Sequence, residues 1–316
     1  PVGGPVLAAL ALIGAAVLVD EGPRIPGSNV AFLSSHRLGN LGASLAVAVV
    51  FLATRRSRDP ANAVMVVGGL VMLLMIGTQN RGGMLAGAAG VMLAVGLWGR
   101  YVRLRATALV ALLLAVLIVA WGLELQVSTA SRDISVAQLD SNVRSLVGSD
   151  RVGSGQLSDT VNFREDLWNK VLAATIANGY MENGWGFGPN LGSSFLPSHA
   201  DRQLRNPHNS HLTVLVRLGI VGMLIWAALW LSWSRRVLRR ARSALRRPHV
   251  LGDHAGRLAL LAAVGACSIL MNAMVDPTLE TPMVATVLWS VFGFGVLAVT
   301  DRSGAAPGPW PEAVSW

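Results

Sequence analysis

A histidine-containing motif stands immediately before a long apolar stretch of the chain. The motif is Asn206-Pro207-His208-Asn209-Ser210-His211, and the apolar stretch covers 210–232. If a helix begins here, its unpaired backbone N–H groups and positive dipole end favour an anion, and Pro207 suits its first turn. An unperturbed histidine has a pKa of about 6.5, so it is largely neutral at neutral pH and can accept a proton. We therefore predict that His208 is a general base, with a capping or interfacial residue as the alternative.

His211 lies one turn further along and is either a second ligand or a packing residue. Two histidines without a nearby cluster of cysteine or glutamate are a weak basis for a metal site. We predict neither a metal nor a cofactor.

Arg81 lies in the tight turn Thr78-Gln79-Asn80-Arg81-Gly82-Gly83, between two apolar stretches. A charge without a partner is disfavoured at the edge of the hydrocarbon, and at a helix centre it costs about 2.5–3.5 kcal/mol on insertion scales. The two glycines let a large group approach the backbone closely. Arg81 is therefore a candidate ligand for an anion, or alternatively a membrane-edge anchor.

Arg164 opens an amphipathic segment, because apolar residues recur with helical spacing over 160–178. Adjacent residues do not face each other on a helix, so pairing with Glu165 or Asp166 would be poor. Trp168 follows in the same segment, and the strip 183–189 alternates glycines with aromatic residues, among them Trp185. This strip is either a sugar-stacking, pocket-lining element or an ordinary loop.

Two further arginines belong to the same set. Arg217 lies two turns into the stretch 210–232, where we expect it to face the bundle interior and pair with Asp276, Glu280 or a ligand phosphate. Arg37 lies at the start of another apolar stretch. Because the planar guanidinium binds phosphate in a bidentate manner, several arginines and a histidine at one membrane edge indicate a lipid-linked diphosphate substrate.

The composition places these residues in a membrane protein. Of the 316 residues, 53% are hydrophobic and 14% are charged, with a mean hydropathy of +0.52, whereas soluble domains carry about 25% charged residues. Disordered, collagen-like, coiled-coil and disulfide-stabilised classes are excluded by the same figures, and the single cysteine, Cys267, can form no intrachain disulfide.

We predict an all-α polytopic membrane protein with about eight transmembrane helices. A span needs about 20 apolar residues, and the stretches that qualify are 1–19, 38–54, 61–78, 83–99, 106–123, 210–232, 257–275 and 282–300. The chain thus divides into spans one to five (1–123), a large extracytoplasmic loop (124–209) with a helix at about 160–178, spans six to eight (210–300) and a cytoplasmic tail (301–316). Since residue 1 enters a span directly without a methionine, we expect further spans before it.

The distribution of arginine predicts the orientation of these spans. The basic breaks at 55–58, 100–105 and 235–257 fall on one side, which with the tail carries 15 arginines and four acidic residues. Short cytoplasmic loops retain positive charge, so this side is cytoplasmic. The net charge of +9 is therefore a topology signal that argues against nucleic-acid binding, and His208, Arg81 and Arg164 face outward.

The chain resembles the O-antigen ligase / O-antigen polymerase family of bacterial membrane glycosyltransferases over about residues 30–300. His208-Asn209, nine residues and Gly219-Ile220-Val221-Gly222 fit the ligase pattern of His, then Asn, Ser or Gln, nine residues, Gly, two residues, and Gly, Thr or Tyr. The turn around Arg81 is similar to the family's Thr-x-Ser-Arg-Gly, with Asn80 in place of Ser. The Arg164 segment with strip 183–189 is similar to the family's loop motifs. Arg37-Leu38-Gly39 weakly resembles an earlier arginine motif but lacks the Asn-Pro usually downstream.

The resemblance implies a GT-C-like, multi-pass enzyme of the bacterial cytoplasmic (inner) membrane, acting in polysaccharide biosynthesis for the cell envelope. Its donor would be a glycan on undecaprenyl diphosphate, and its acceptor a hydroxyl of a glycan or lipid-linked glycan at the extracytoplasmic face. His208, Arg81 and Arg164 would be the catalytic residues of a metal-independent, inverting transfer. The substrate-binding residues would be Arg37, Asn209, His211, Arg217, Trp168 and Trp185.

Alternative functions stay open at this point. A polymerase uses the same donor and differs from a ligase only in its acceptor. A transporter of lipid-linked glycans would also need outer arginines, although transporters often carry charges near the midplane and inverted repeats. An assembly subunit without activity is the third alternative, which glycan transfer by the purified protein would exclude.

Overall fold

The computed structural model describes residues 81–98, 126–128, 133–135, 140, 155–177, 207–246, 254–280 and 282–300. These residues are mainly helical. The elements are α4 (Arg81–Trp98), β1 (Gln126–Ser128), β2 (Asp133–Ser135), α7 (Gly155–Ala177), α9 (Ser210–Arg246), α10 (His254–Asn272), the 3-10 helix η3 (Thr278–Glu280) and α11 (Pro282–Thr300). β1 and β2 form a short antiparallel hairpin in which Val127 lies opposite Ile134, a feature that the all-α prediction did not include.

Four helices coincide with expected spans, at 83–99, 210–232, 257–275 and 282–300. The stretches 1–19, 38–54, 61–78 and 106–123 lie outside the described residues, as do Arg37 and Trp185. Among the described helices, one passes a test of length and hydropathy for crossing a membrane, over Ser210–Ser243 of α9. The apolar parts of α4, α10 and α11 are shorter.

α9 continues 14 residues beyond the end expected at 232, to Arg246. The extension is amphipathic: Trp233, Val237 and Ala241, spaced four residues apart, are buried, while most of the arginines between them are exposed. Residues four apart share one helix face, so the helix packs through this stripe after the fully apolar run has ended.

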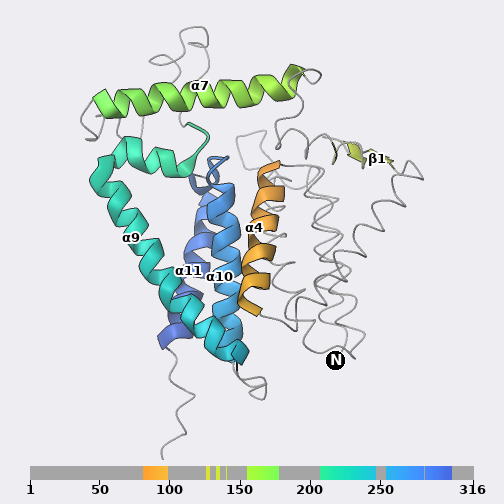
Figure 1. The fold of residues 1–316 in the computed structure, drawn as a ribbon, viewed down its shortest axis with the longest axis vertical. Coiled ribbons are helices and arrows are strands. Elements are labelled where there is room, and N and C mark those ends of the chain that lie inside the picture. The colour runs from red at the N-terminus through yellow and green to blue at the C-terminus, as the bar shows by residue number, and fades with distance from the viewer. Residues whose placement is uncertain are drawn as a thin grey trace, which may run out of the picture.

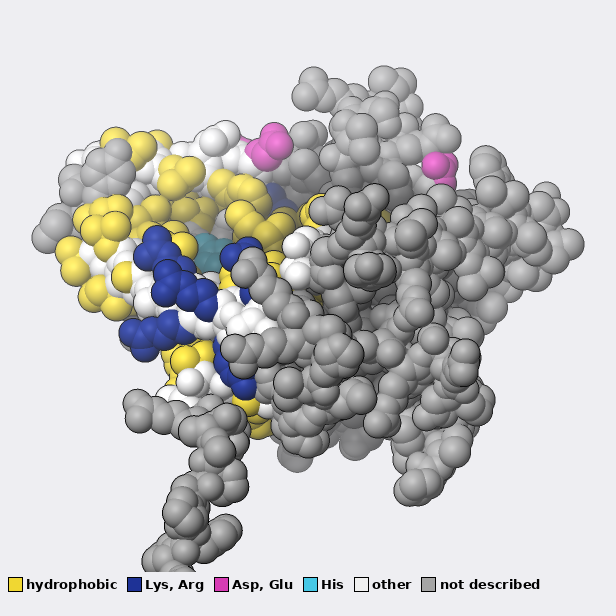
Figure 2. Space-filling view, turned by 60° about the horizontal axis from the view of Figure 1, so that its bottom comes forward, with side chains coloured by type: hydrophobic (Ala, Val, Ile, Leu, Met, Phe, Trp, Pro, Cys, Tyr) yellow, Lys and Arg dark blue, Asp and Glu magenta, His cyan; other side chains and the backbone are white. Residues whose placement is uncertain are grey.

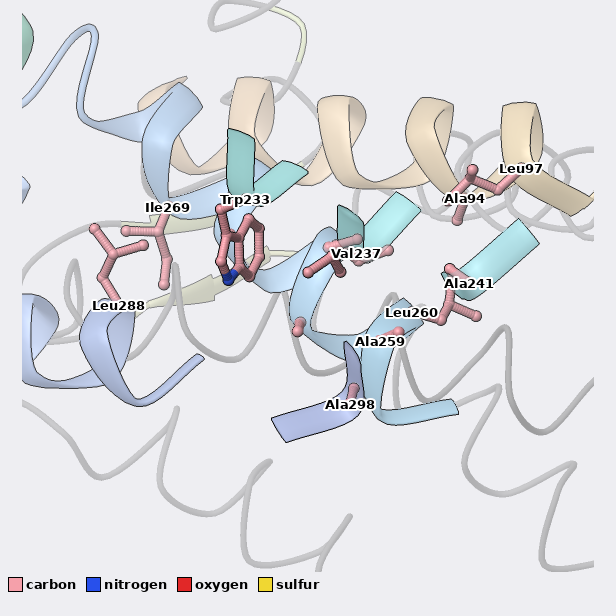
Figure 3. Close-up of a cluster of buried hydrophobic side chains, with 14 of the residues drawn as sticks. Ala94, Leu97, Trp233, Val237, Ala241, Ala259, Leu260, Ile269, Leu288 and Ala298 are labelled. Atoms are coloured by element: carbon pink, nitrogen blue, oxygen red, sulfur yellow. The ribbon is translucent and has the colours of Figure 1, made fainter. Parts of the chain in front are cut away.

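α10 lies at the centre of the helix bundle and packs against α4, α9 and α11 (Figure 1). Its buried face is rich in alanine, with Ala259, Ala262, Ala263 and Ala266 all nearly inaccessible. Small residues let helix backbones approach closely, which favours packing between membrane helices. Figure 3 shows Ala94 of α4, Val237 and Ala241 of α9, and Ala298 of α11 in the same cluster.

The outward faces of α9 and α11 are apolar. Val221, Leu224 and Ile225 on α9 are more than 60% exposed, and Phe294 and Leu297 on α11 are at least half exposed. Contiguous exposed apolar surface is unfavourable in water and is typical of helices that face lipid or a partner.

The two ends of the bundle differ. α7 lies across one end, over the N-terminal part of α9 (Figure 1). The other end carries the C-terminal part of α9, where Figure 2 shows basic side chains gathered on the surface. They include Arg235, Arg236, Arg239 and Arg242.

Candidate functional site

α7 is fixed to the first turns of α9 by an apolar cluster. Leu167 and Val171 of α7, one turn apart, are fully buried against Leu212 and Val216 of α9. Phe163, Trp168 and Leu215 pack around this cluster. α7 begins at Gly155, five residues before the start predicted from the apolar spacing. The cluster places Arg164 and Trp168 next to the residues that precede α9.

Asn209 caps the N-terminus of α9. Its Oδ1 atom accepts hydrogen bonds from the backbone N–H groups of His211 and Leu212, both at 3.0 Å. The N–H of Ser210 donates to the carbonyl of Ala273 at 2.8 Å. The expectation that these N–H groups are open to an anion was wrong, because the protein itself occupies them. Any anion here must therefore be held mainly by side chains.

Pro207 also differs from its expected place. It lies two residues before the cap, outside the first turn, and its carbonyl accepts a hydrogen bond from the indole N–H of Trp168 at 2.6 Å. The indole N–H of Trp168 thus holds the segment that leads to His208, and substrate binding by Trp168 stays a prediction.

His208 has a left-handed backbone conformation, with φ of 53°. It is the one non-glycine residue with positive φ among those described. This conformation is uncommon for non-glycine residues and gathers at functional sites, where surrounding contacts maintain it. Here the contacts are the Trp168–Pro207 hydrogen bond on one side and the Asn209 cap on the other.

The turn between α10 and α11 completes the site. Arg164 donates from a guanidinium nitrogen to the carbonyl of Val275 at 2.8 Å. The hydroxyl of Ser210 donates to the carbonyl of Asp276 at 3.3 Å and accepts from the N–H of Leu279 at 3.2 Å. Three segments far apart in sequence are thereby joined: α7, the start of α9 and residues 273–280.

Three ionisable side chains influence one another in this site. Burial and the positive charge of Arg164 both lower the pKa of His208, while Asp276 opposes them and raises it. Burial lowers the pKa of Arg164, again opposed by Asp276; arginine stays protonated at neutral pH even so. His208 is thus a half-buried, neutral imidazole next to a cation at neutral pH.

The sequence of the chain shows its family. A family model described as O-antigen ligase matches residues 67–227, just over half of the chain. The chain belongs to the O-antigen ligase family. Members of this family are bacterial membrane proteins of polysaccharide biosynthesis with ligase- or polymerase-type activity. A search of curated proteins gave no match.

The O-antigen ligase motif has a clear structural meaning in this chain. The nine residues between Asn209 and Gly219 form the first segment of α9, which we call the entry segment (210–218). Gly219 ends it with φ of 66° and ψ of −170°, a conformation essentially restricted to glycine. At Gly222 an added Cβ would collide with the side chain of Leu218. The motif therefore encodes a capped helical segment followed by a bend.

Three other expected site residues belong to described helices. Arg81 is the first residue of α4, and Arg217 is half-buried in the entry segment. His211 is fully engaged by the protein: its Nδ1 accepts from the indole N–H of Trp226 at 3.1 Å, and its Nε2 lies 3.0 Å from the carbonyl of Leu270. Of its two predicted roles, these contacts describe the packing one.

Arg164 does not form the ion pair with Glu165 or Asp166 that was the alternative considered for it. It bonds to Val275, and Asp166 instead forms an ion pair with Lys170 at 2.6 Å. No group of three or more metal-ligating side chains occurs within the described part of the chain.

Asp276 and Ser210 were not among the predicted site residues. Asp276 and Glu280 were considered only as possible partners of Arg217. The side chain of Glu280 accepts a hydrogen bond from Thr213 at 2.8 Å. A signal was present: both acids lie in the short connection between two spans, on the side of the membrane predicted for His208. Short connections must stay close to neighbouring helix ends, so these acids were candidates for the same site.

Proposed function

We propose that this chain is an inverting, metal-independent glycosyltransferase that moves a glycan from undecaprenyl diphosphate to an acceptor hydroxyl. The single observation that carries the proposal is the gathering of His208, Arg164 and Asp276 where α7, the start of α9 and the α10–α11 turn meet. Membership of the O-antigen ligase family supports the general activity. The donor, the stereochemistry and the roles of individual residues are part of the proposal.

His208 is the proposed base. The acceptor hydroxyl gives its proton to the imidazole as its oxygen forms a bond to the anomeric carbon. The bond from that carbon to the diphosphate oxygen breaks, and the diphosphate leaves with the electron pair. A single displacement of this kind inverts the anomeric centre. A base must be unprotonated to act, and the lowered pKa of His208 supports this role at neutral pH.

Arg164 is the proposed diphosphate ligand in the described site. One guanidinium nitrogen is oriented by the carbonyl of Val275. A guanidinium has five N–H donors, so others remain to bind phosphate oxygens while the first fixes the side chain. Charge develops on the diphosphate as it leaves, and a preorganised cation in a partly dry site stabilises that charge. Asp276 sets the local charge balance. Arg81, Arg37 and Arg217 are proposed as further cations for the donor, and Asn209 and Trp185 as acceptor or donor contacts.

The proposed active site faces the extracytoplasmic side of the cytoplasmic membrane. It lies at the end of α9 opposite the exposed arginines 235, 236, 239 and 242 (Figures 1 and 2). Arginine-rich ends of spans stay cytoplasmic, so the end that carries His208 is the outer one. A lipid-linked donor in the outer leaflet would present its diphosphate at this height.

Glycan transfer in proteoliposomes tests the function. The donor is an undecaprenyl-diphosphate-linked oligosaccharide, offered with a panel of acceptors that separates ligase from polymerase activity. We expect transfer by the wild type, unaffected by a chelator, and a loss of about 10²–10³-fold in Arg164→Gln, Arg81→Ala and His208→Ala. Lys170→Ala, which removes an exposed cation of α7 that pairs with Asp166, is the matched control and should keep full activity.

Two outcomes would overturn the proposal. Full activity in His208→Ala, with normal expression, would remove the base from the mechanism. Protein-dependent movement of the labelled lipid across the bilayer without any glycan transfer would indicate a transporter instead.

A further inference from the structure

His211 and Trp226 form a hydrogen bond that a straight helix does not allow. The two residues are 15 positions apart in α9, which would separate them by about 22 Å along the axis of a continuous helix. Their side chains meet at 3.1 Å. The contact exists because the chain reverses part of its course at Gly219, between the two residues, as the bend of α9 in Figure 1 shows.

The same imidazole also joins α9 to α10. The indole N–H of tryptophan is a donor only, so Nδ1 of His211 must accept from it. The proton of the neutral ring therefore sits on Nε2, which donates to the carbonyl of Leu270 at 3.0 Å. Leu270 belongs to the last turn of α10, where carbonyls have no partner within the helix. One ring thus closes the bend and occupies a carbonyl at the end of the neighbouring helix.

We propose that the pair His211–Trp226 is a clasp that positions the catalytic end of the entry segment, and that both are positioning residues for the reaction. This inference rests on the proposed function of His208. Glycine at the bend permits the turn but does not fix its angle, because glycine has the widest choice of backbone conformations. The His211–Trp226 hydrogen bond fixes the angle between the two segments of α9. The hydrogen bond from His211 to the carbonyl of Leu270 fixes the entry segment against α10.

The position of His208 depends on that angle. The entry segment is one rigid helical piece, with Asn209 as its cap at the end that carries His208. Arg164 lies on α7, which packs against the entry segment, but its guanidinium is bonded to the carbonyl of Val275 in the α10–α11 turn. Its position relative to His208 therefore depends on how the entry segment lies against α10 and that turn. A change at the bend would therefore move the base relative to the diphosphate ligand, without touching either.

Trp230 provides a matched control for Trp226. It lies one turn further along α9 in the same aromatic cluster, with its ring 5.6 Å from that of Trp226. It is equally an indole, but its N–H has no hydrogen-bond partner in the described structure. Substitution by phenylalanine removes an N–H in both cases and keeps an aromatic ring, so the difference between the two variants isolates the clasp hydrogen bond.

The test compares Trp226→Phe, His211→Leu, His211→Gln and Trp230→Phe in the proteoliposome assay. A misplaced base slows the chemical step and leaves donor binding largely intact, so we expect kcat to fall about tenfold in Trp226→Phe and His211→Leu with little change in the donor KM. His211→Gln keeps one acceptor and one donor, and should recover part of the activity. Trp230→Phe should match the wild type.

Hydrogen exchange of the detergent-solubilised full chain, followed by mass spectrometry, gives a second readout that needs no activity. We expect faster exchange over 207–218 in Trp226→Phe and unchanged exchange in Trp230→Phe. If wild type transfers no glycan, the proposed function fails, and exchange still tests the clasp alone.

Three results would overturn the inference. The first is a Trp226→Phe variant whose kcat and hydrogen exchange both equal those of the wild type. The second is a fall in kcat in Trp226→Phe without faster exchange in the entry segment. The third is an equal effect of Trp226→Phe and Trp230→Phe. If His211→Leu fails to fold, judged by size-exclusion chromatography, Trp226→Phe and His211→Gln still decide the question.

Discussion

The two segments of α9 on either side of Gly219 are held in different ways. The entry segment packs against α7 through Leu212 and Val216, but it is joined to α10 and the residues that follow α10 by directional bonds. Ser210 and His211 donate to the carbonyls of Ala273 and Leu270. The segment after the bend packs mainly through apolar and aromatic side chains, such as Val237 and Trp233 against α10 and α11. Apolar packing stabilises without regard to direction, whereas hydrogen bonds define orientation. The residues proposed for chemistry lie on the side where orientation is defined.

The largest expected effects are a loss of activity from a substitution next to the entry segment and a loss of stability from one in the segment after the bend. His208→Gln should reduce glycan transfer by about 10²–10⁴-fold, since it removes the base, and should leave the melting temperature nearly unchanged. Trp233→Ala should do the reverse, because Trp233 is 6% exposed and truncating a buried tryptophan costs about 3–5 kcal/mol. Transfer rates per folded molecule and thermal melting in detergent measure both quantities. The contrast between the two segments of α9 would be contradicted if His208→Gln lowered the melting temperature strongly, or if Trp233→Ala kept its melting temperature but lost activity.

The bend between the segments should tolerate an alanine poorly. Gly219→Ala forces a side chain into a conformation essentially reserved for glycine, at a cost of about 1–3 kcal/mol. We expect a lower melting temperature together with slower transfer. Gly293→Ala in α11 is the control, since a Cβ there meets nothing within 4 Å, and alanine should be neutral or slightly stabilising in a helix. Equal melting temperatures for the two variants would show that Gly219 does not bear the strain assigned to it.

The difference between the segments also explains what the sequence could predict. Apolar runs predicted the bounds of α11 and placed α10 within three residues at each end, because burial in a bundle or in lipid depends on residue type along a continuous stretch. The amphipathic end of α9 was missed because a search for fully apolar runs ends at the first cluster of arginines, although Val237 and Ala241 continue a helical stripe.

The candidate site was predictable in composition but not in geometry. His208 and Arg164 were found by residue type, and they do share a site. The cap at Asn209 was not anticipated, nor were the contacts of Ser210 with Ala273 and Asp276. These contacts join residues more than 60 positions apart, and no local pattern indicates which carbonyls will lie opposite a given helix end.

The pH dependence of transfer should depend on the charges of Arg164 and Asp276 near His208. Because burial and Arg164 lower the pKa of His208, transfer should rise with pH through a midpoint below that of free histidine and be level at neutral pH. Asp276 raises this pKa, so Asp276→Asn should move the midpoint to lower pH, and Arg164→Gln should move its residual activity to higher pH. Profiles of kcat/KM between mildly acidic and neutral pH measure the shifts.

The same shift affects stability with a defined sign. A histidine whose pKa is lower in the folded state binds protons more readily in the unfolded chain. His208 should therefore reduce stability as the pH falls below the value of free histidine, and His208→Gln should remove that part of the dependence. In the pH profiles of kcat/KM, midpoints that shift in the same direction in Asp276→Asn and Arg164→Gln would contradict the opposite effects of these two charges on the pKa of His208.

The smallest effect should come from the exposed face of α7, opposite the face that holds the entry segment. Lys170 and Asp166 form an ion pair at 2.6 Å, with side chains 44% and 52% exposed. Solvent-exposed pairs one helical turn apart contribute only about 0.3–0.5 kcal/mol. Lys170→Ala should therefore lower the melting temperature by little and leave transfer unchanged, although it removes a cation two turns from Arg164. A large loss of transfer in Lys170→Ala would mean that the two cations of α7, Arg164 and Lys170, act together, and that the specific contact of Arg164 with Val275 does not set the site.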